Sequence, residues 1–491
     1  MSDTPTLPPT PGKFKPRPPR KPFFAGRSSG LKLIIVCALV LLMSIPAMFI
    51  SYISYERSSR ADDVTREVSQ DYGGPQLVTG PHIVVPYVKR NDDAREMTLG
   101  DYVFSAETGE VVLDDIKVKE VSLSLFDVPV FKTDGTLSAS FSDPRKIDVD
   151  DRLKLDWSQA MIVFNLSEVK GLRGDVQLKI GDTAQQFTYQ QIRRPNAPSY
   201  TQRTRSGDGD IIETQRIYEL NYDLIAQRDG GYLAVPATAL LAKFDAGATR
   251  LTTTIDLSLS GAQKLSIVPF AKLTKINLQS NWPHPGFDGP FPPDDREITE
   301  EGFAANWTIP LLRRGIISHG SARGFRQLYE TYGGMSVNFV SPLDPYRTVN
   351  RALKYSVLFI GMVFLAYFLF EVIVGVPVHP AQYILIGLAQ SIFYLLLLAF
   401  SERIGFTGAF AISAGATIAA TSGYAGAVFG GRQYIAKAGA VFLLVYGLLY
   451  ALMRMQDFAL MIGALASFIA IAGTMYLTRN INWYGAKSAA A

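Results

Sequence analysis

The stretch that decides the fold begins at Arg351 as RALKYSVLFIGMVFLAYFLFEVIVGVPVHPAQYILIGLAQSIFYLLLLAF (residues 351–400) and continues to Arg479. It contains five apolar segments of 20 residues or more with few charged side chains: Leu353–Val374, Ala381–Phe400, Phe406–Phe429, Tyr434–Met453 and Phe458–Leu477. About 20 helical residues cross a hydrocarbon core of ~30 Å. A soluble domain has no use for five successive helices that are apolar all round, so the sequence predicts an integral membrane protein.

A sixth apolar segment, Leu33–Tyr55, lies near the N-terminus and contains no charged residue. It is longer than the core of a signal peptide, and no clean small-residue cleavage site follows it. We therefore expect residues 31–55 to form an uncleaved first transmembrane helix. Glu56–Gln70 is polar but rich in good helix formers, which predicts that the helix continues until Gly73-Gly74-Pro75 ends it.

Residues 1–30 interleave prolines with lysines and arginines. This composition cannot bury a core, so we expect a disordered basic tail of the polyproline type in the cytoplasm. A solvated tail near anionic lipid is the favoured interpretation, and a ligand for a proline-binding domain is the alternative.

The distribution of lysine and arginine predicts the orientation. Seven of these residues precede Leu33, and six spans place them on the same side as Arg432, Arg479 and the tail of residues 480–491. The positive-inside rule makes that side cytoplasmic, so both termini are predicted to be cytoplasmic and residues 56–350 periplasmic. Three cations at the start of the second span count against this orientation, Arg347, Arg351 and Lys354, as do Arg403 and Arg454.

Residues 56–350 contain short segments, many of them alternating, that are separated by Gly, Asp, Asn and Pro. Thr252–Leu259, for example, alternates polar and apolar residues, the pattern of a half-buried strand. We expect a mainly antiparallel β domain, either a sandwich or two stacked sheets, with a subdomain boundary near residues 193–209. Together with a five-helix transmembrane bundle at residues 351–479, this gives an α+β membrane protein with six transmembrane helices.

The composition argues against several classes of function. A net charge of +4 is too small to indicate nucleic-acid binding. The single cysteine, Cys37, excludes an intramolecular disulfide, and the four histidines are widely scattered. The sequence contains no nucleophile elbow, HExxH motif, phosphate loop or cysteine pair. We therefore expect no enzyme activity, no catalytic residue, no metal site and no cofactor.

Outside the membrane, the densest group of polar and aromatic residues comprises Trp282, His284, Asp288 and Trp307. One interpretation is the rim of a binding site for a ligand or partner. We favour a rigid, proline-bounded loop with buried tryptophan anchors, because one histidine and one aspartate do not make a site.

Ionisable and polar side chains gather at both ends of the predicted spans. The group at the cytoplasmic end is Glu371, His379, Gln382 and Arg479, and the group at the periplasmic end is Lys354, Glu402, Arg403, Arg454 and Asp457. Such groups are costly at a membrane boundary unless they are paired or hydrated. We favour ion pairs that hold the bundle together, Glu371 with Arg479 and Asp457 with Lys354 or Arg454. A proton or substrate path is the alternative, which we disfavour because these groups leave the middle of the membrane apolar.

The segment Phe406–Phe429 carries small residues at every fourth position: Ala411, Gly415, Ala419, Gly423 and Ala427. Gly426 and Gly430 add a GxxxG spacing. Residues at this spacing share one helix face and let another backbone approach closely. We favour packing inside the bundle and keep a homodimer interface as the alternative.

Four long, ordered stretches are similar to the CreD family of bacterial inner membrane proteins. They are Gly73-Gly74-Pro75-Gln76 to Val85-Pro86-Tyr87, Phe126-Asp127-Val128-Pro129-Val130-Phe131, Ser280-Asn281-Trp282-Pro283-His284-Pro285 to Asn306-Trp307, and the membrane end from Arg351 to Trp483-Tyr484. Two positions depart from the family pattern, Gly286 in place of serine and Asn482 in place of aspartate, which argues against chemistry at either. The resemblance implies six spans, a large periplasmic domain and a role in envelope homeostasis linked to envelope stress, but no known reaction.

We favour a non-enzymatic protein of the cell envelope, in which a periplasmic β domain on a membrane bundle senses or stabilises a component of the membrane or wall. The alternative is a transporter or lipid-handling protein with a periplasmic substrate-binding domain. Against it, no two spans are interrupted by glycine or proline at matching positions. An intramembrane enzyme is a third interpretation, disfavoured by the scarcity of His, Asp and Glu at membrane depth. The expected partners are the lipid bilayer, an envelope or cell-wall component and, as the open alternative above, a second copy of the chain.

Overall fold

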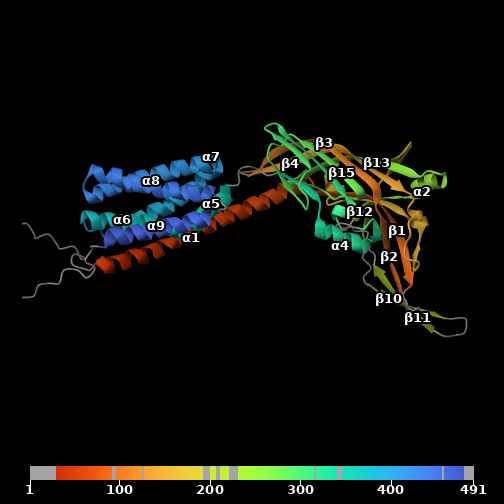
Figure 1. The fold of residues 1–491 in the computed structure, drawn as a ribbon, viewed down its shortest axis with the longest axis horizontal. Coiled ribbons are helices and arrows are strands. Elements are labelled where there is room, and N and C mark those ends of the chain that lie inside the picture. Colours follow the sequence, from red (N-terminus) through yellow and green to blue (C-terminus); the bar gives the residue numbers. More distant parts are fainter. Residues whose placement is uncertain are drawn as a thin grey trace, which may run out of the picture. The chain divides into compact units, whose positions relative to one another are not determined.

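Figure 1 shows the computed structural model, which describes residues 29–90, 96–123, 126–191, 199–205, 211–219, 231–314, 317–339, 345–455 and 458–479. The chain divides into two compact units, one formed by Met1–Ser59 with Leu343–Ala491 and one by Arg60–Pro342. We call them the helical unit and the β unit. Several predictions lie outside the described residues: those for the basic tail up to residue 28, Asp457, Asn482, residues 480–491 and most of the boundary at 193–209.

The helical unit is built from long apolar helices. Its elements are the first part of α1 (Ser29–Asp71), then α5 (Pro345–Lys354), α6 (Ser356–Val374), α7 (Pro380–Phe429), α8 (Arg432–Arg454) and α9 (Ala459–Thr478). In the part of the chain that the structure describes, five helices are long and apolar enough to cross a membrane, namely α1 and α6 to α9. The six predicted apolar segments fall on five helices because α7 carries two of them.

Helix α7 reverses direction at Gly405. It has 50 residues, and the backbone of Gly405 has φ 72° and ψ 166°, which no helical residue adopts. The rings of Phe393 and Phe410 lie 5.7 Å apart, whereas 17 residues of continuous helix would separate them by about 25 Å. The chain therefore folds back, and the two arms of α7 pack against each other.

The segment predicted as Leu353–Val374 is divided in the structure, because α5 ends at Lys354 and α6 begins at Ser356. Helix α5 is amphipathic. Its buried residues are Tyr346, Val349, Ala352 and Leu353, and its last residue, Lys354, is exposed. The predicted start of this span was therefore wrong by three residues, since Leu353 belongs to the buried face of a separate short helix.

Helix α1 ends at Asp71, where Gly73 and Gly74 adopt φ angles of 89° and 64°. Both angles lie in the left-handed region, where glycine carries no steric penalty. The predicted continuation of the first helix and its end at Gly73-Gly74-Pro75 are thus confirmed. In the β unit, Val68 near the end of α1 packs on Val128 and Val130.

Two sheets form the β unit (Figure 1). Within the described residues, the first sheet has twelve strands: β1 (Gln76–Arg90), β2 (Glu96–Phe104), β5 (Leu153–Leu155), β6 (Met161–Leu166), β9 (Thr188–Gln191), β10 (Ser199–Arg205), β11 (Ile211–Glu219), β12 (Gly231–Pro236), β14 (Lys264–Ile267), β16 (Pro285–Asp288), β19 (His319–Ser321) and β20 (Met335–Phe339). The second, counted in the same way, has eight: β3 (Ala106–Leu123), β4 (Phe126–Ser142), β7 (Gln177–Ile180), β8 (Thr183–Gln186), β13 (Arg250–Ala262), β15 (Ala271–Ser280), β17 (Asp295–Thr299) and β18 (Gly302–Pro310).

Most neighbouring strands are antiparallel, as predicted, and the described exceptions are the parallel pairs β1–β14, β2–β11 and β3–β15. The core lies between the two sheets, where Ile83 and Phe104 of the first meet Val111 and Phe131 of the second in one apolar cluster. Strand β13 shows the predicted alternation: Ile255, Leu257 and Leu259 are buried, and the polar residues between them point away from the core.

The other face of the first sheet is covered by helix α4 (Ala322–Tyr332), whose Phe325 and Tyr329 pack on Val84 of β1 and Val103 of β2. Beneath this helix lies His82, which is fully buried, and its Nε2 is 2.7 Å from the hydroxyl of Tyr329. The short helices α2 (Thr238–Asp245) and α3 (Leu311–Arg314) complete the β unit.

One histidine of the β unit makes its stability depend on pH. His319 on β19 lies 2.8 Å, Nδ1 to hydroxyl, from Tyr102 of β2 and stacks on the ring of Phe104. Burial, helped by the Lys272 ammonium, lowers the pKa of His319. Its usual value is about 6.5. The unfolded chain therefore takes up this proton before the folded chain does, and stability is lost as the pH falls below that value.

We predict that the full-length protein in detergent unfolds at a lower temperature at pH 5 than at pH 7.5. The variant His319→Gln should lose part of this difference, because it removes a group that the fold holds neutral. The exposed His284, replaced by Gln, provides the matched control. An equal pH dependence in wild type and His319→Gln would contradict the prediction.

Candidate functional site

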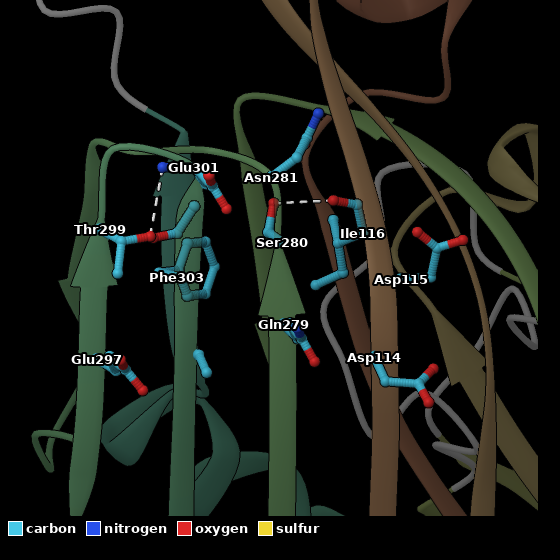
Figure 2. Close-up of a pocket in the computed structure, with 12 residues that line it drawn as sticks. Asp114, Asp115, Ile116, Gln279, Ser280, Asn281, Glu297, Thr299, Glu301 and Phe303 are labelled. Atoms are coloured by element: carbon cyan, nitrogen blue, oxygen red, sulfur yellow. Dashed lines mark hydrogen bonds between the residues drawn. The ribbon is translucent and has the colours of Figure 1, made fainter.

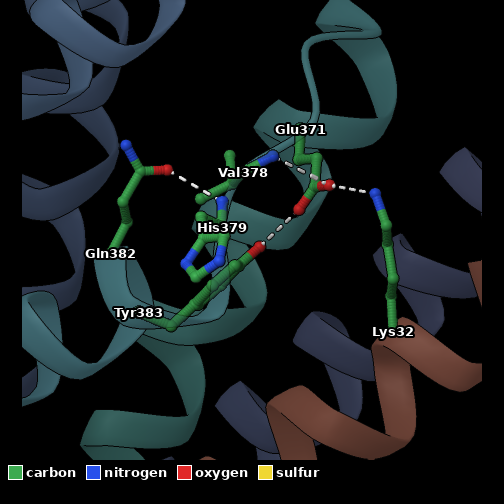
Figure 3. A network of polar contacts seen from close by, with 6 residues as sticks. All are labelled: Lys32, Glu371, Val378, His379, Gln382 and Tyr383. Atoms are coloured by element: carbon green, nitrogen blue, oxygen red, sulfur yellow. Dashed lines mark hydrogen bonds and ion pairs between the residues drawn. The ribbon is translucent and has the colours of Figure 1, made fainter. Parts of the chain in front are cut away.

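One candidate site is centred on Glu371, one turn before the end of α6. Its side chain is 7% exposed. Oε1 accepts hydrogen bonds from Lys32 Nζ at 2.9 Å and from the backbone N–H of Val378 at 3.1 Å, and Oε2 accepts one from the hydroxyl of Tyr383 at 3.0 Å. Figure 3 shows these donors converging on the carboxylate from three directions. The carboxylate is thus paired with a cation and hydrogen-bonded at both oxygens, which offsets the cost of burying it.

His379 and Gln382 belong to the same region but bind each other rather than Glu371. His379 is the N-cap of α7, and its Nδ1 accepts from the N–H of Ala381 at 3.2 Å. The side chain of Gln382 accepts from the N–H of His379 at 2.9 Å (Figure 3). This capping box satisfies two donors at the helix start. It also holds the preceding residue, Val378, in place to donate to Glu371.

Lys32, and not Arg479, is the cation that binds Glu371. Arg479 lies over the ring of Tyr476, with its guanidinium carbon 4.4 Å from the ring centre. The predicted pair was wrong because α1 brings its own lysine to the end of α6. Lys32 is the last cation before the apolar run of α1. A cation at that position is a signal for a pair at the end of the bundle, in addition to its value for the orientation.

At the opposite end of the spans, the predicted charges do not form one network among the described residues. Glu402 accepts a hydrogen bond at 2.9 Å from the hydroxyl of Tyr346, which fastens α5 to α7. Arg454 donates to the hydroxyl of Tyr450 at 3.3 Å and lies over its ring. Lys354 and Arg403 are exposed. The predicted partner Asp457 lies outside the described residues, so pairs with it remain predictions.

The small-residue stripe of α7 points away from the rest of the helical unit. A methyl group added at Gly415 or Gly423 would meet nothing within 4 Å. At Gly426 it would lie 2.2 Å from a side-chain carbon of Ile435 in α8. Gly430 ends the helix with φ 75°. Packing inside the chain was thus the wrong interpretation for Gly415 and Gly423, whereas Gly426 does pack against a neighbour.

The polar–aromatic loop of the β unit is held by its own hydrogen bonds. Trp282 is 8% exposed and donates through its indole N–H to the carbonyl of His284 at 3.1 Å. Trp307 is 2% exposed and donates to the carbonyl of Phe291 at 3.3 Å. Asp288 binds Lys264 at 3.0 Å, and this contact lowers the pKa of the carboxyl. Both indoles are buried, as the favoured interpretation expects of anchors.

A groove of about 410 Å³ in the second sheet was missed by the sequence analysis. Figure 2 shows Glu297 of β17, Gln279 of β15 and Asp114 of β3 in a row across the sheet, in which β18 lies between β17 and β15, with Asp115 and Glu301 nearby. Exposed carboxylates on one surface attract cations. The described residues contain no group of three or more His, Cys, Asp or Glu side chains placed to hold a metal ion. The signal in the sequence was the acidic run DDREITEE at residues 294–301, which contains β17, a strand whose residues are all exposed.

The middle of the helical unit is not apolar, which corrects a second expectation. Polar side chains from both arms of α7 and from α8 are buried there: Gln390, Ser413, Thr417, Thr421 and Tyr446. The hydroxyl of Tyr446 donates to Gln390 Oε1 at 2.7 Å, and that of Tyr367 in α6 donates to the carbonyl of Thr421. Isolated serine, threonine and glutamine residues in an apolar run carry no periodic signal, so the pattern alone did not predict that they meet.

Comparison with known proteins agrees with this architecture. The family model described as Inner membrane protein CreD matches residues 28–484. The chain is similar to Inner membrane protein CreD of Escherichia coli (strain K12), with 29% identity over 450 residues that cover 91% of each chain.

We predict that Lys32 and Glu371 are energetically coupled. Removing one partner of a buried ion pair typically costs about 3–5 kcal/mol, because it leaves the other charge without compensation. Lys32→Met and Glu371→Gln should each lower the melting temperature in detergent and the amount of protein in membranes. The double variant should lose less than the sum of the two. Arg479→Met is the matched control and should behave as wild type. Additive losses in the double variant would contradict the pairing.

We predict opposite outcomes for two glycines three residues apart. Gly426→Leu should overpack the contact with Ile435 and destabilise the protein by about 1–3 kcal/mol. Gly423→Leu should leave the melting temperature unchanged, since a side chain there meets open space. The measurement is thermal unfolding in detergent together with size determination. Equal destabilisation by both variants would contradict the placement of the stripe, and a smaller particle with Gly423→Leu would show that the stripe binds a second copy.

Proposed function

This chain belongs to the CreD family of inner membrane proteins, and we propose that it supports the integrity of the bacterial cell envelope without catalysing a reaction. What carries the proposal is the extent of the family match, residues 28–484, which includes both the helical unit and the β unit. An inner membrane protein with a large folded domain outside the membrane is suited to sense or stabilise a component of the envelope.

The proposal includes a topology of six spans with both termini in the cytoplasm and the β unit in the periplasm. The reversal of α7 at Gly405 supports six spans, because its 50 residues would extend about 75 Å as one helix, more than twice the ~30 Å hydrocarbon core. The seven cations that precede Leu33 support a cytoplasmic N-terminus.

The hydrogen bonds of the polar groups in the membrane helices support a structural role for these groups. Glu371 is engaged by a lysine, a backbone N–H and a tyrosine, and His379 and Gln382 by each other. A general acid or base needs a face open to its substrate. The hydrogen bonds of Glu371, His379 and Gln382 are made within the helical unit. This favours a role in holding the helices together.

One observation favours the second candidate function, a transporter or lipid-handling protein. Gln390 and Tyr446 are fully buried near the middle of their helices, where a conduit would place its polar groups. Against it, none of the side chains in this buried group carries a charge.

The topology is tested by labelling single cysteines in a Cys37→Ser background. Glu297→Cys, on the exposed strand β17, should react in intact cells with a reagent that cannot cross the inner membrane. Gln433→Cys, at the start of α8, should react only after the membrane is opened. The reverse pattern would overturn the orientation, and labelling of both sites in intact cells would overturn the six-span count.

The role in the envelope is tested in cells that lack the gene. We predict that these cells become more sensitive to a β-lactam and to detergent, and that the full-length chain restores resistance. A photo-crosslinking residue at Ile298 of β17, which is 48% exposed, should then capture the component that the β unit contacts. The same residue at Tyr189, 45% exposed on β9, is the matched control. Unchanged sensitivity of the deletion strain under all these stresses would contradict the proposal.

A further inference from the structure

The second sheet carries another groove, of about 330 Å³, on its outer face. Its charged lining residues are Asp115, Lys117 and Lys119 of β3, Lys132 and Asp134 of β4, and Arg173. Four cations and two carboxylates leave this basic groove with an excess of two positive charges. It adjoins the acidic groove that Asp114 and Glu297 line, because Asp115 belongs to both.

The register of the strands places Lys117 and Lys132 directly opposite each other on β3 and β4. Their neighbours Val118 and Phe131 enter the core, so both lysine side chains point to the outer face. Side chains at opposite positions of an antiparallel pair have Cβ atoms about 5 Å apart, and like charges there are destabilising. The fold therefore holds two ammonium groups close enough to repel each other.

The carboxylates of the basic groove offset only part of this repulsion. Asp115 binds Lys117, with Oδ2 2.8 Å from Nζ. Asp134 lies 3.8 Å from a guanidinium nitrogen of Arg173, and its other oxygen accepts a hydrogen bond from the hydroxyl of Ser258. Within the described part of the chain, Lys132 makes no ion pair. An anion in the groove would supply the charge that Lys132 lacks.

Lys119 adds a further cation at one end of the basic groove. Its ammonium nitrogen lies 5.9 Å from the centre of the Tyr72 ring, just after the end of α1. A cation at this distance is attracted by the face of the ring. The contact positions Lys119 without neutralising it, so its charge remains available to a ligand.

We propose that the basic groove binds a phosphate group. A phosphate ester carries a charge of about −1.5 to −2 at neutral pH, which matches the excess of positive charge in the groove. Lysine binds phosphate as a point charge, and the fork of an arginine can donate to two phosphate oxygens. Lys132 and Lys117 approach the ligand from the strands, and Arg173 approaches it from the segment beside β13.

The volume of the basic groove, about 330 Å³, falls in the range of small-molecule sites. It has room for more than the phosphate itself. The ligand is thus the headgroup of an anionic lipid or a small soluble phosphate compound, and the phosphate group is the chemistry that the two share. The inference goes beyond the role in the envelope and does not depend on it, because phosphate binding is measured on the purified protein.

The test measures the affinity of the purified full-length protein, in a non-ionic detergent, for two probes. One is inorganic pyrophosphate and the other is dihexanoyl-phosphatidylglycerol. Lys132→Gln and Arg173→Gln should each weaken binding by about tenfold, the effect of losing one charged hydrogen bond. Lys275→Gln is the matched control, since Lys275 is an exposed lysine of β15 outside the basic groove. It should keep the affinity of wild type.

The two probes distinguish the sources of the phosphate. Binding of pyrophosphate alone would identify a soluble phosphate compound, and binding of the lipid alone would identify a headgroup. Binding of both would show that the phosphate group is sufficient. Binding of neither probe would overturn the proposal, and so would wild-type affinity in both Lys132→Gln and Arg173→Gln.

The melting temperature separates a loss of binding from a loss of folding. Without ligand, Lys132→Gln should melt no lower than wild type, because it removes one member of a like-charge pair. A saturating probe should raise the melting temperature of wild type and of Lys275→Gln, and raise that of Lys132→Gln less. A lower melting temperature of Lys132→Gln without ligand would contradict the repulsion on which the proposal rests.

Discussion

The helical unit depends on one constraint: inside a membrane, every polar group must find its partner within the protein. Glu371 shows how this constraint organises the fold. Its carboxylate takes donors from Lys32 in α1, from the turn before α7 and from Tyr383 within α7. A charge that would be prohibitive alone thereby joins three segments, one of which is more than 300 residues away in the sequence. The buried carboxylate is also the reason that the first helix cannot be exchanged for any apolar anchor, since a helix without Lys32 leaves the charge uncompensated.

The β unit is not under this constraint, because water solvates the polar groups on its surface. Its strands alternate, so each apolar side chain enters the core while the polar neighbours stay hydrated, as β13 shows. The carboxylates of the groove, among them Asp114 and Glu297, are exposed, and Asp115 beside them pairs with Lys117 at 2.8 Å. Such a surface is tolerated in water and would be impossible at membrane depth. Buried polar side chains in this unit, such as His82, lie beneath α4 and bind its Tyr329.

Sequence patterns predicted those features that depend on local periodicity. The apolar segments, the alternation of Thr252–Leu259 and the end of α1 at its glycines were all visible in this way. Patterns did not predict which helix face turns inward. The small-residue face of α7, with Gly423, was expected to pack inside, but the structure buries the face with Phe410, Ser413 and Thr417. A hydroxyl in the interior can bind a neighbouring helix as well as its own backbone, whereas a glycine that faces lipid leaves no polar side chain there, so the polar face takes the interior. The partner of Glu371 was missed for a related reason, because the pairing of distant helices leaves no trace in local spacing.

A structural bundle and a conduit differ in the charge and hydration of their buried groups. A path for protons or ions needs groups that change charge or remain hydrated along its length. In the described membrane helices, the carboxylate of Glu371 sits near an end and is bound by three donors, while Glu402 sits near the other and binds Tyr346. Between them the buried groups, including Gln390 and Tyr446, are neutral and bind one another. Neutral groups in mutual contact stabilise helix packing without offering a charge to move. Among the described residues, a bundle that is polar inside and still neutral at its centre therefore lacks the series of charged groups that a path for protons or ions needs.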